Sequence, residues 1–212
     1  MLSKQHKIVN NVPDFKDEVG NWITSYTTTT SDYYIQHRTM AFNLWLGINN
    51  RCKSGGSQQT KSPAYAGTEN HFKDFQEFAE WCNSQENYGR LDDKGNRWQL
   101  DKDLFGKHYS PETCIFIPAA LNTLLKASPK KFNDLPTGVT IDNSNNRKQI
   151  YSVRYSRYKL GYVGRARFNC PIIAGEHWRR NRVESLLMAS EDNELPIRVS
   201  LELAKLALSY CC

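Results

Sequence analysis

The sequence lacks three features: a long apolar run, a paired-cysteine motif and an apolar signal core near its start. Because a helix needs roughly 18–20 apolar residues to cross a bilayer, we expect a soluble, cytoplasmic protein without a membrane partner. Six cysteines are present, but none stands in a CxxC pair. The sequence therefore supports neither a disulfide framework nor a zinc site, and we expect reduced thiols.

Acidic residues are scarce in one part of the chain. Residues 147–182 contain ten Lys or Arg and a single acid, Glu176, whereas the formal charge of the whole chain is only +6. This basic segment carries +9, which leaves −3 for the remainder. Such asymmetry indicates a surface that binds a polyanion, and arginine, which supplies eight of the ten cations, suits phosphates and guanine edges. A solvated face and an acidic protein partner fit the same charge.

The first third of the chain is polar and then turns helical in pattern. Residues 1–31 are rich in threonine and predict a loosely ordered lead-in. Apolar residues at helical spacing predict a helix over residues 32–49, capped by Asp32. A second amphipathic helix is predicted over residues 71–83, capped by Asn70.

The middle of the chain predicts a strand, a loop, a second strand and a helix. The strands are short, at residues 98–100 and 115–117, and the helix at 118–126 begins with proline. Residues 128–136 are typical of a linker, and we place a domain boundary there.

Beyond this linker the pattern predicts a small α+β unit. Three short strands are expected at residues 138–141, 149–155 and 160–163, with a polar turn after the first. Two helical stretches follow, at residues 171–189 and 196–210. The basic residues concentrate on these strands and on the first of the two helices.

Two short sequence motifs in the middle of the chain are its most distinctive feature. They are Leu100-Asp101-Lys102-Asp103 and Tyr109-Ser110-Pro111-Glu112-Thr113-Cys114. Together with the helices before them, over about residues 33–125, they resemble the phage-encoded HNH-type nucleases and their bacterial relatives. The resemblance implies a ββα-metal centre that uses one divalent cation, Mg²⁺ or Mn²⁺, against a scissile DNA phosphate. A phage-encoded protein would act in the host cell cytoplasm.

The resemblance also assigns a metal-binding pair. Asp101 falls where the family has its metal carboxylate, and Asn122 falls where the family has the Asn or His of the helix. A carboxylate and an amide are both hard oxygen ligands, which Mg²⁺ and Mn²⁺ prefer.

Four further residues are candidates for catalysis at the same centre. Lys102 stands where the family commonly has a His base; a protonated lysine cannot accept a proton, although it could stabilise the reacting phosphate. Thr113 replaces the Asn that normally holds the turn. His108 is either a substitute base or an exposed loop histidine, and Asp103 is either a second metal ligand or a turn acid.

Residues 137–189 resemble a second family, the small DNA-binding domain of plant ethylene-response factors. The matching motifs are Gly138-Val139, Tyr151-Ser152-Val153-Arg154-Tyr155 and Leu160-Gly161. The helix departs from the usual alanine-rich pattern. In that family the three-stranded sheet lies in the major groove of double-stranded DNA, and side chains on one face reach the bases.

Strand alternation divides the basic residues by role. It puts Arg154 on one face of its strand and Val153 on the other, so Arg154, together with Arg165, is the candidate for base edges. The other basic residues, some at predicted turns and strand ends, are expected to contact phosphates. The predicted DNA-binding residues are Arg154, Arg157, Lys159, Arg165, Arg167, Arg179, Arg180 and Arg182.

The expected fold is α+β: N-terminal helices with a small HNH-like centre at residues 32–127, then a basic domain at 137–212 with a three-stranded antiparallel sheet on a helix, and a C-terminal helix. Three functions fit this plan. The first is a metal-dependent endonuclease that nicks or cuts double-stranded DNA. The second is an inactive HNH-like factor that regulates or inhibits a host enzyme or defence system. The third is a module whose basic face binds an acidic protein.

Overall fold

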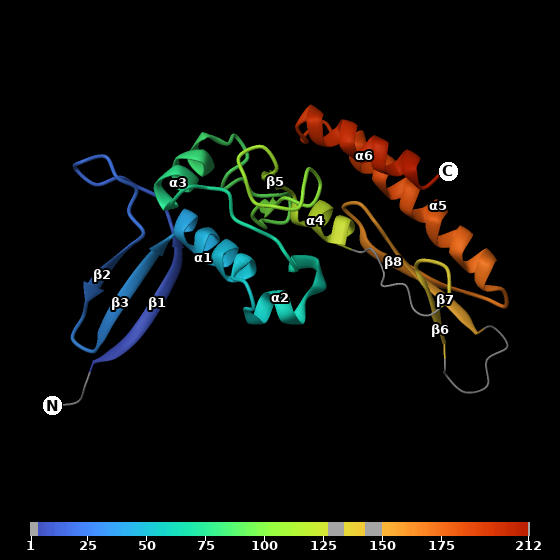
Figure 1. Cartoon of the computed structure of the whole chain (residues 1–212), viewed down its shortest axis with the longest axis horizontal. Helices are drawn as coiled ribbons and strands as arrows, with labels where there is room; N and C mark the ends of the chain where they lie inside the picture. Colours follow the sequence, from blue (N-terminus) through green and yellow to red (C-terminus); the bar gives the residue numbers. More distant parts are fainter. Residues whose placement is uncertain (1–3, 127–133, 143–149, 212) are drawn as a thin grey trace. The chain divides into compact units, whose positions relative to one another are not determined.

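A computed structural model describes residues 4–126, 134–142 and 150–211 (Figure 1). The fold is α+β, as predicted, and combines helices with small, separate sheets. Within the described ranges, no helix is both long enough and apolar enough to cross a membrane.

The chain divides into two compact units. The first comprises Met1–Arg90 and Leu100–Phe116, and the second comprises Leu91–Gln99 and Ile117–Cys212. This division differs from the predicted boundary at residues 128–136, most of which lie outside the described residues.

The N-terminal region forms a three-stranded sheet instead of the predicted lead-in. Strands β1 (Gln5–Val12) and β2 (Ser25–Thr29) flank β3 (Tyr33–Thr39), with β1 parallel and β2 antiparallel to it. The helix predicted from residue 32 is therefore wrong over β3 and begins at Met40. Aromatic and β-branched residues favour a strand wherever partner strands are present, and here the Thr-rich β2 supplies one.

Helices follow this sheet in the first unit. They are α1 (Met40–Cys52), the short α2 (Ser57–Lys61), the 3₁₀ turn η1 (Pro63–Tyr65) and α3 (Phe75–Ser84). Helix α3 starts later than predicted because Asp74, not Asn70, caps it: the Asp74 carboxylate accepts a hydrogen bond from the Glu77 N–H at 3.0 Å.

Aromatic rings fill the core of the first unit. Phe78 is fully buried; its ring centre lies 5.0 Å from that of Phe72 and 5.5 Å from that of Trp45. Trp81 stacks on Phe116 at 5.7 Å, and Phe116 lies in the short strand that directly follows the Tyr109–Cys114 motif.

The predicted strand–loop–strand–helix order is present. Strands β4 (Gln99–Asp101) and β5 (Ile115–Ile117) pair in a two-stranded sheet, and α4 (Ala119–Lys126) follows. Strand β5 is buried along its whole length, so its position is determined by packing.

The second unit contains the predicted three-stranded antiparallel sheet. Its order is β6 (Val139–Ile141), β7 (Tyr151–Arg157) and β8 (Gly161–Phe168). Helices α5 (Pro171–Ser190) and α6 (Ile197–Ser209) complete the unit, and α6 packs along α5 (Figure 1). Strand β8 is longer than predicted.

One face of this sheet packs against α5. Val139 and Val153 are directly opposite each other on β6 and β7, and they form one buried cluster with Ala174 and Trp178 of the helix. Gly138 makes the contact with Trp178 close: an added Cβ would stand 2.3 Å from the Trp178 ring, and the Gly138 φ is +84°. The absence of a side chain at Gly138 is thus a requirement of this core.

Gly138→Ala should destabilise the chain by about 2–5 kcal/mol, because it combines left-handed backbone strain with a clash in the core. Gly161→Ala is the matched control: its φ is +72°, but nothing lies within 4 Å of an added Cβ. It should cost about 1–2 kcal/mol from the backbone alone. Urea unfolding of both variants measures the difference, and equal losses would contradict the tight Trp178 contact.

Candidate functional site

The turn after β4 is organised by Asp101, the predicted metal carboxylate. Asp101 is only 5% exposed, and its Oδ2 accepts a hydrogen bond from the Leu104 N–H at 3.1 Å. The Lys102 carbonyl accepts bonds from the N–H groups of Phe105 and Gly106, at 3.1 and 2.9 Å. A tight turn therefore holds the Asp101 carboxylate in a largely desolvated position.

Lys102, the residue in place of the usual base, is buried with 2% exposed. Its ammonium donates to the carboxylate of Asp103, which is itself about half exposed, and lies 5.5 Å from the centre of the Tyr109 ring. A general base must offer a lone pair, whereas this nitrogen donates. Lys102 is here a paired cation, and Asp103 is its counter-charge.

A second cation reaches the same tyrosine from α1. Arg51 donates a hydrogen bond to the Tyr109 hydroxyl at 2.9 Å, and its guanidinium carbon lies 5.7 Å from the centre of the Tyr65 ring. Burial raises the pKa of Tyr109 to about 12, against the opposing effect of the Arg51 charge. No local pattern pointed to Arg51, because 58 positions separate it from Tyr109.

Thr113 closes the turn that leads into β5. Its hydroxyl donates to the His108 carbonyl at 2.7 Å and accepts from the Ser110 N–H at 3.1 Å. The side chain thus performs the turn-holding role that the resemblance gives to Asn, with a donor and an acceptor on one oxygen.

His108, the predicted substitute base, lies with Glu69 and His71. Its Nδ1 accepts a hydrogen bond from the Glu69 N–H at 3.1 Å, and its ring stacks on that of His71 with centres 4.8 Å apart. A bridge between Asn70 and Tyr109 brings the two segments together. Sequence reasoning missed Glu69, since this bridge joins residues that are distant in the chain.

This group offers nitrogen and oxygen donors to a cation. The Glu69 Oε2 is 3.0 Å from the His71 Nε2 and 3.7 Å from the His108 Nδ1, and one ligand atom from each residue lies within 4.8 Å of the others. The hydrogen bond with His71, and then the His108 charge, lower the pKa of the Glu69 carboxyl. Imidazole and carboxylate suit transition-metal ions such as Zn²⁺.

Asn122, the predicted metal amide, is buried on α4 with 2% exposed. Its Nδ2 donates to the Gln99 Oε1 at 2.7 Å, which orients the amide. Its Oδ1 is buried and has no hydrogen-bond partner in the part of the chain that the structure describes. Asn122 belongs to the second unit and Asp101 to the first.

The sheet of the second unit turns its arginines to the face opposite α5. Arg154 is exposed and stands directly across from Arg165 of β8, while Val153 points into the core, as the alternation predicted. Arg167, directly across from Ser152, lies on the same open face. Arg165 and Arg167 were expected near strand ends, but both lie inside β8.

One carboxylate lies among these arginines. Asp142 follows β6, and its side chain is only 6% exposed beneath two guanidinium groups. Its Oδ2 is 2.8 Å from the Arg167 Nε and 3.7 Å from an Arg165 nitrogen. Arg154 has no carboxylate partner among the described residues.

The remaining predicted DNA-binding residues divide into paired and exposed side chains. Arg157 pairs with Glu184 at 3.0 Å. Lys159 pairs with Asp192 at 3.0 Å, and its hydrogen bond with Asp192 raises the pKa of the ammonium. Exposed positions on α5 belong to Arg179 and Arg180. Two further basic residues, Arg147 and Lys148, lie outside the described residues.

Arg182 departs most from its predicted role. It is 5% exposed, and its guanidinium donates to the Leu124 carbonyl in the last turn of α4. An exposed phosphate contact was expected; instead the side chain binds one carbonyl near a helix C-terminus, where a cation is favoured.

Comparisons with protein-family models, with curated proteins and with solved structures gave no match to this chain. The two family resemblances therefore remain predictions that depend on the residues quoted for them.

The Glu69 group predicts a pH dependence. Because the pKa of Glu69 lies below its ordinary value of 4.5, its ionised form stabilises the fold above that pH, and the stabilisation is lost as the pH falls through the lower folded-state pKa. Between about pH 5 and about pH 3, the Tm of the parent should fall more steeply than that of Glu69→Gln. Exposed Glu86, replaced by Gln, is the control and should follow the parent. Parallel curves for parent and Glu69→Gln would contradict the pairing.

Proposed function

We propose that the chain binds double-stranded DNA through the open face of the β6–β7–β8 sheet. The observation that carries the proposal is the cross-strand pair Arg154 and Arg165, with Arg167 on the same face and a single described carboxylate, Asp142, among them. A face so rich in guanidinium groups attracts a polyanion.

The dimensions of the sheet suit the major groove. Three strands about 4.8 Å apart span roughly 10 Å, and the groove is about 12 Å wide. Between the arginines the exposed residue is the short Thr140, whose hydroxyl oxygen lies 3.0 Å from that of the fully buried Ser152. Base edges can therefore approach the strands, and a bidentate arginine suits guanine.

The ion pairs rank the arginines. Arg154 is the strongest candidate for a base contact, because no described carboxylate competes for it. Arg157 and Lys159 must exchange Glu184 and Asp192 for phosphates, so their net contribution is smaller. Arg179 and Arg180 are expected to contribute less to DNA binding, since they lie on α5, which packs against the opposite face of the sheet.

Two charge-matched double variants test this proposal. Arg154→Gln with Arg165→Gln should weaken binding to a short duplex by about a hundredfold or more, since each bidentate contact contributes about 1–3 kcal/mol. Arg179→Gln with Arg180→Gln removes the same charge and should weaken binding by only about tenfold or less. Fluorescence anisotropy over a salt series measures both, and the affinity of the parent should fall steeply with salt.

Equal losses from the two double variants would mean that charge alone attracts DNA. Failure of the parent to bind duplex, or binding that ignores salt, would overturn the proposal and favour an acidic protein partner.

A second candidate function, metal-dependent cleavage of the bound DNA, is favoured by the Asn122 amide. A buried, oriented oxygen without a described partner is a suitable ligand for a hard cation, and Asp101 offers a desolvated carboxylate. Mg²⁺ or Mn²⁺ bound at the Asp101 carboxylate would stabilise the leaving oxygen of a phosphodiester. The pairing of Lys102 with Asp103 favours the alternative, a factor that binds without cleaving, because the base position then holds a cation.

Calorimetry with Mn²⁺ and Mg²⁺ tests the cation. Asp101→Ala should weaken binding by about tenfold or more, because a carboxylate ligand is removed. His71→Ala is the control variant from the other donor group; if it alone abolishes binding, the cation belongs to Glu69, His71 and His108. If the parent shows no metal-binding isotherm and does not nick supercoiled plasmid with either metal, the cleavage function is excluded. The chain would then be a factor that binds without cleaving.

A further inference from the structure

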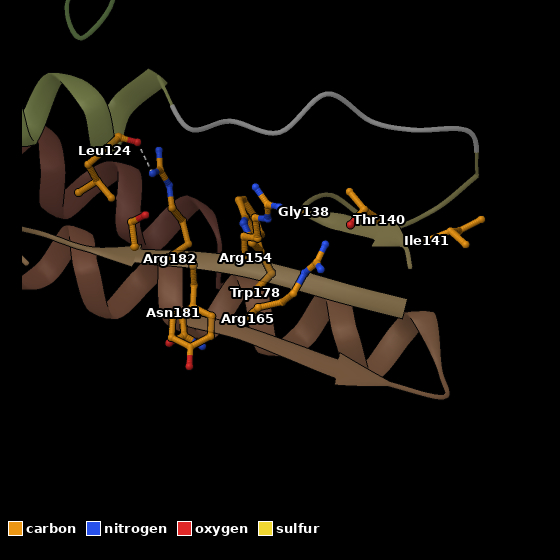
Figure 2. Close-up of a pocket in the computed structure, with 11 residues that line it drawn as sticks. Leu124, Gly138, Thr140, Ile141, Arg154, Arg165, Trp178, Asn181 and Arg182 are labelled. Carbon is orange, nitrogen blue, oxygen red and sulfur yellow. Dashed lines mark hydrogen bonds between the residues drawn. The ribbon is translucent and has the colours of Figure 1, made fainter. Parts of the chain in front are cut away.

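A hollow of about 580 Å³ opens in the second unit beside the open sheet face (Figure 2). It lies where β7 extends past the short β6, and residues of α4, α5 and all three strands line it. Leu124 of α4 and Trp178 of α5 form apolar parts of its wall.

The charged residues that line the hollow are Arg154, Arg165 and Arg182, and no acid is among the described lining residues. Figure 2 shows the three arginine side chains extending to the same side of the strands. Like charges gathered in this way repel one another, so the arrangement favours a bound anion.

Arg182 strengthens this argument because it is buried without a counter-charge. Its guanidinium has the Leu124 carbonyl as a partner, but its Nε is buried and has no hydrogen-bond partner among the described residues. The Nε of Arg165 is buried and unpartnered in the same way. A buried guanidinium without a carboxylate, such as that of Arg182, is costly, and a phosphate in the hollow would satisfy its Nε together with the Nε of Arg165.

The size and the walls of the hollow suit more than a phosphate. Ligand sites typically enclose about 300–1,000 Å³, and this volume is far larger than one phosphate group. Tyr155 and Trp178 supply aromatic surface, and Asn181 and Ser156 supply polar groups, as a nucleobase requires.

We propose that the hollow holds a single unpaired nucleotide of the bound DNA, with its phosphate at Arg154, Arg165 and Arg182 and its base against the Tyr155 side. This inference rests on the proposed DNA binding and names its substrate class: duplex that carries a nucleotide outside the base-pair stack. Such a nucleotide comes from a strand end or from an unpaired position within the duplex, and both present the same chemistry.

In the first experiment, isothermal calorimetry measures the binding of deoxynucleoside 5′-monophosphates, deoxynucleosides and inorganic phosphate to the whole protein. The monophosphates should bind, and loss of the phosphate or of the base should each weaken binding by about tenfold or more. Arg182→Gln and Arg154→Gln should each weaken monophosphate binding by about tenfold. Lys205→Gln is the control, since Lys205 lies exposed on α6 and pairs with Glu202; it should bind as the parent does.

The second experiment compares three short duplexes: fully paired, with a 5′-phosphorylated overhang, and with an internal unpaired nucleotide. The parent should prefer one or both unpaired forms by about tenfold, and the preferred form identifies the source of the nucleotide. Arg182→Gln should abolish this preference while its affinity for fully paired duplex stays within about twofold of the parent.

The inference and the proposed function fail in different ways. No binding of monophosphates and no preference for unpaired forms, with fully paired duplex still bound, would overturn the nucleotide site alone. Loss of binding to every duplex in the parent would overturn the proposed function. If Arg182→Gln does not fold, as judged by circular dichroism, Arg154→Gln decides through the monophosphate titration, and unchanged binding there would contradict the site.

Discussion

The packing of Trp178 over Gly138 and Val153 is the contact on which the second unit depends. It commits one face of β7 to the core, and strand alternation then leaves Arg154 no place but the other face. A slip of one residue in β7 would bury Arg154 against an indole and expose Val153. Selection for the hydrophobic contact and selection for a cationic surface are therefore satisfied by the same register.

Much of this unit could be predicted, because its signals are local. The inward Val153 and the outward Arg154 follow from strand alternation, and the predicted bounds of α5 and α6 agree with the structure within a few residues. The N-terminal sheet could not be predicted in this way. Tyr33–Thr39 becomes a strand only because β1 and β2 pair with it. Those partner segments are largely polar, so their sequences do not show the alternating apolar pattern that predicts a strand.

The candidate centre shows the same limit at the level of side chains. The order of β4, β5 and α4 followed from local sequence patterns, and the replacement of the turn-holding Asn by Thr113 followed from the resemblance. The partners of Tyr109 and His108 followed from neither. Arg51 contacts Tyr109, and Glu69 contacts His108, through tertiary contacts between segments that are distant in the chain. Such contacts cannot be predicted from local patterns in a single sequence.

The placement of Asp142 under Arg165 and Arg167 has a consequence for how the sheet face discriminates among ligands. The carboxylate acts as an internal counterion, so these two guanidinium groups are partly neutralised before any DNA arrives. A loosely held phosphate gains less from them than from bare arginines, and fewer solution ions are released when they engage. Asp142 thus weakens the non-specific attraction of anions and holds the Arg165 and Arg167 guanidinium groups in a fixed orientation. A ligand whose acceptors do not match this orientation binds less well.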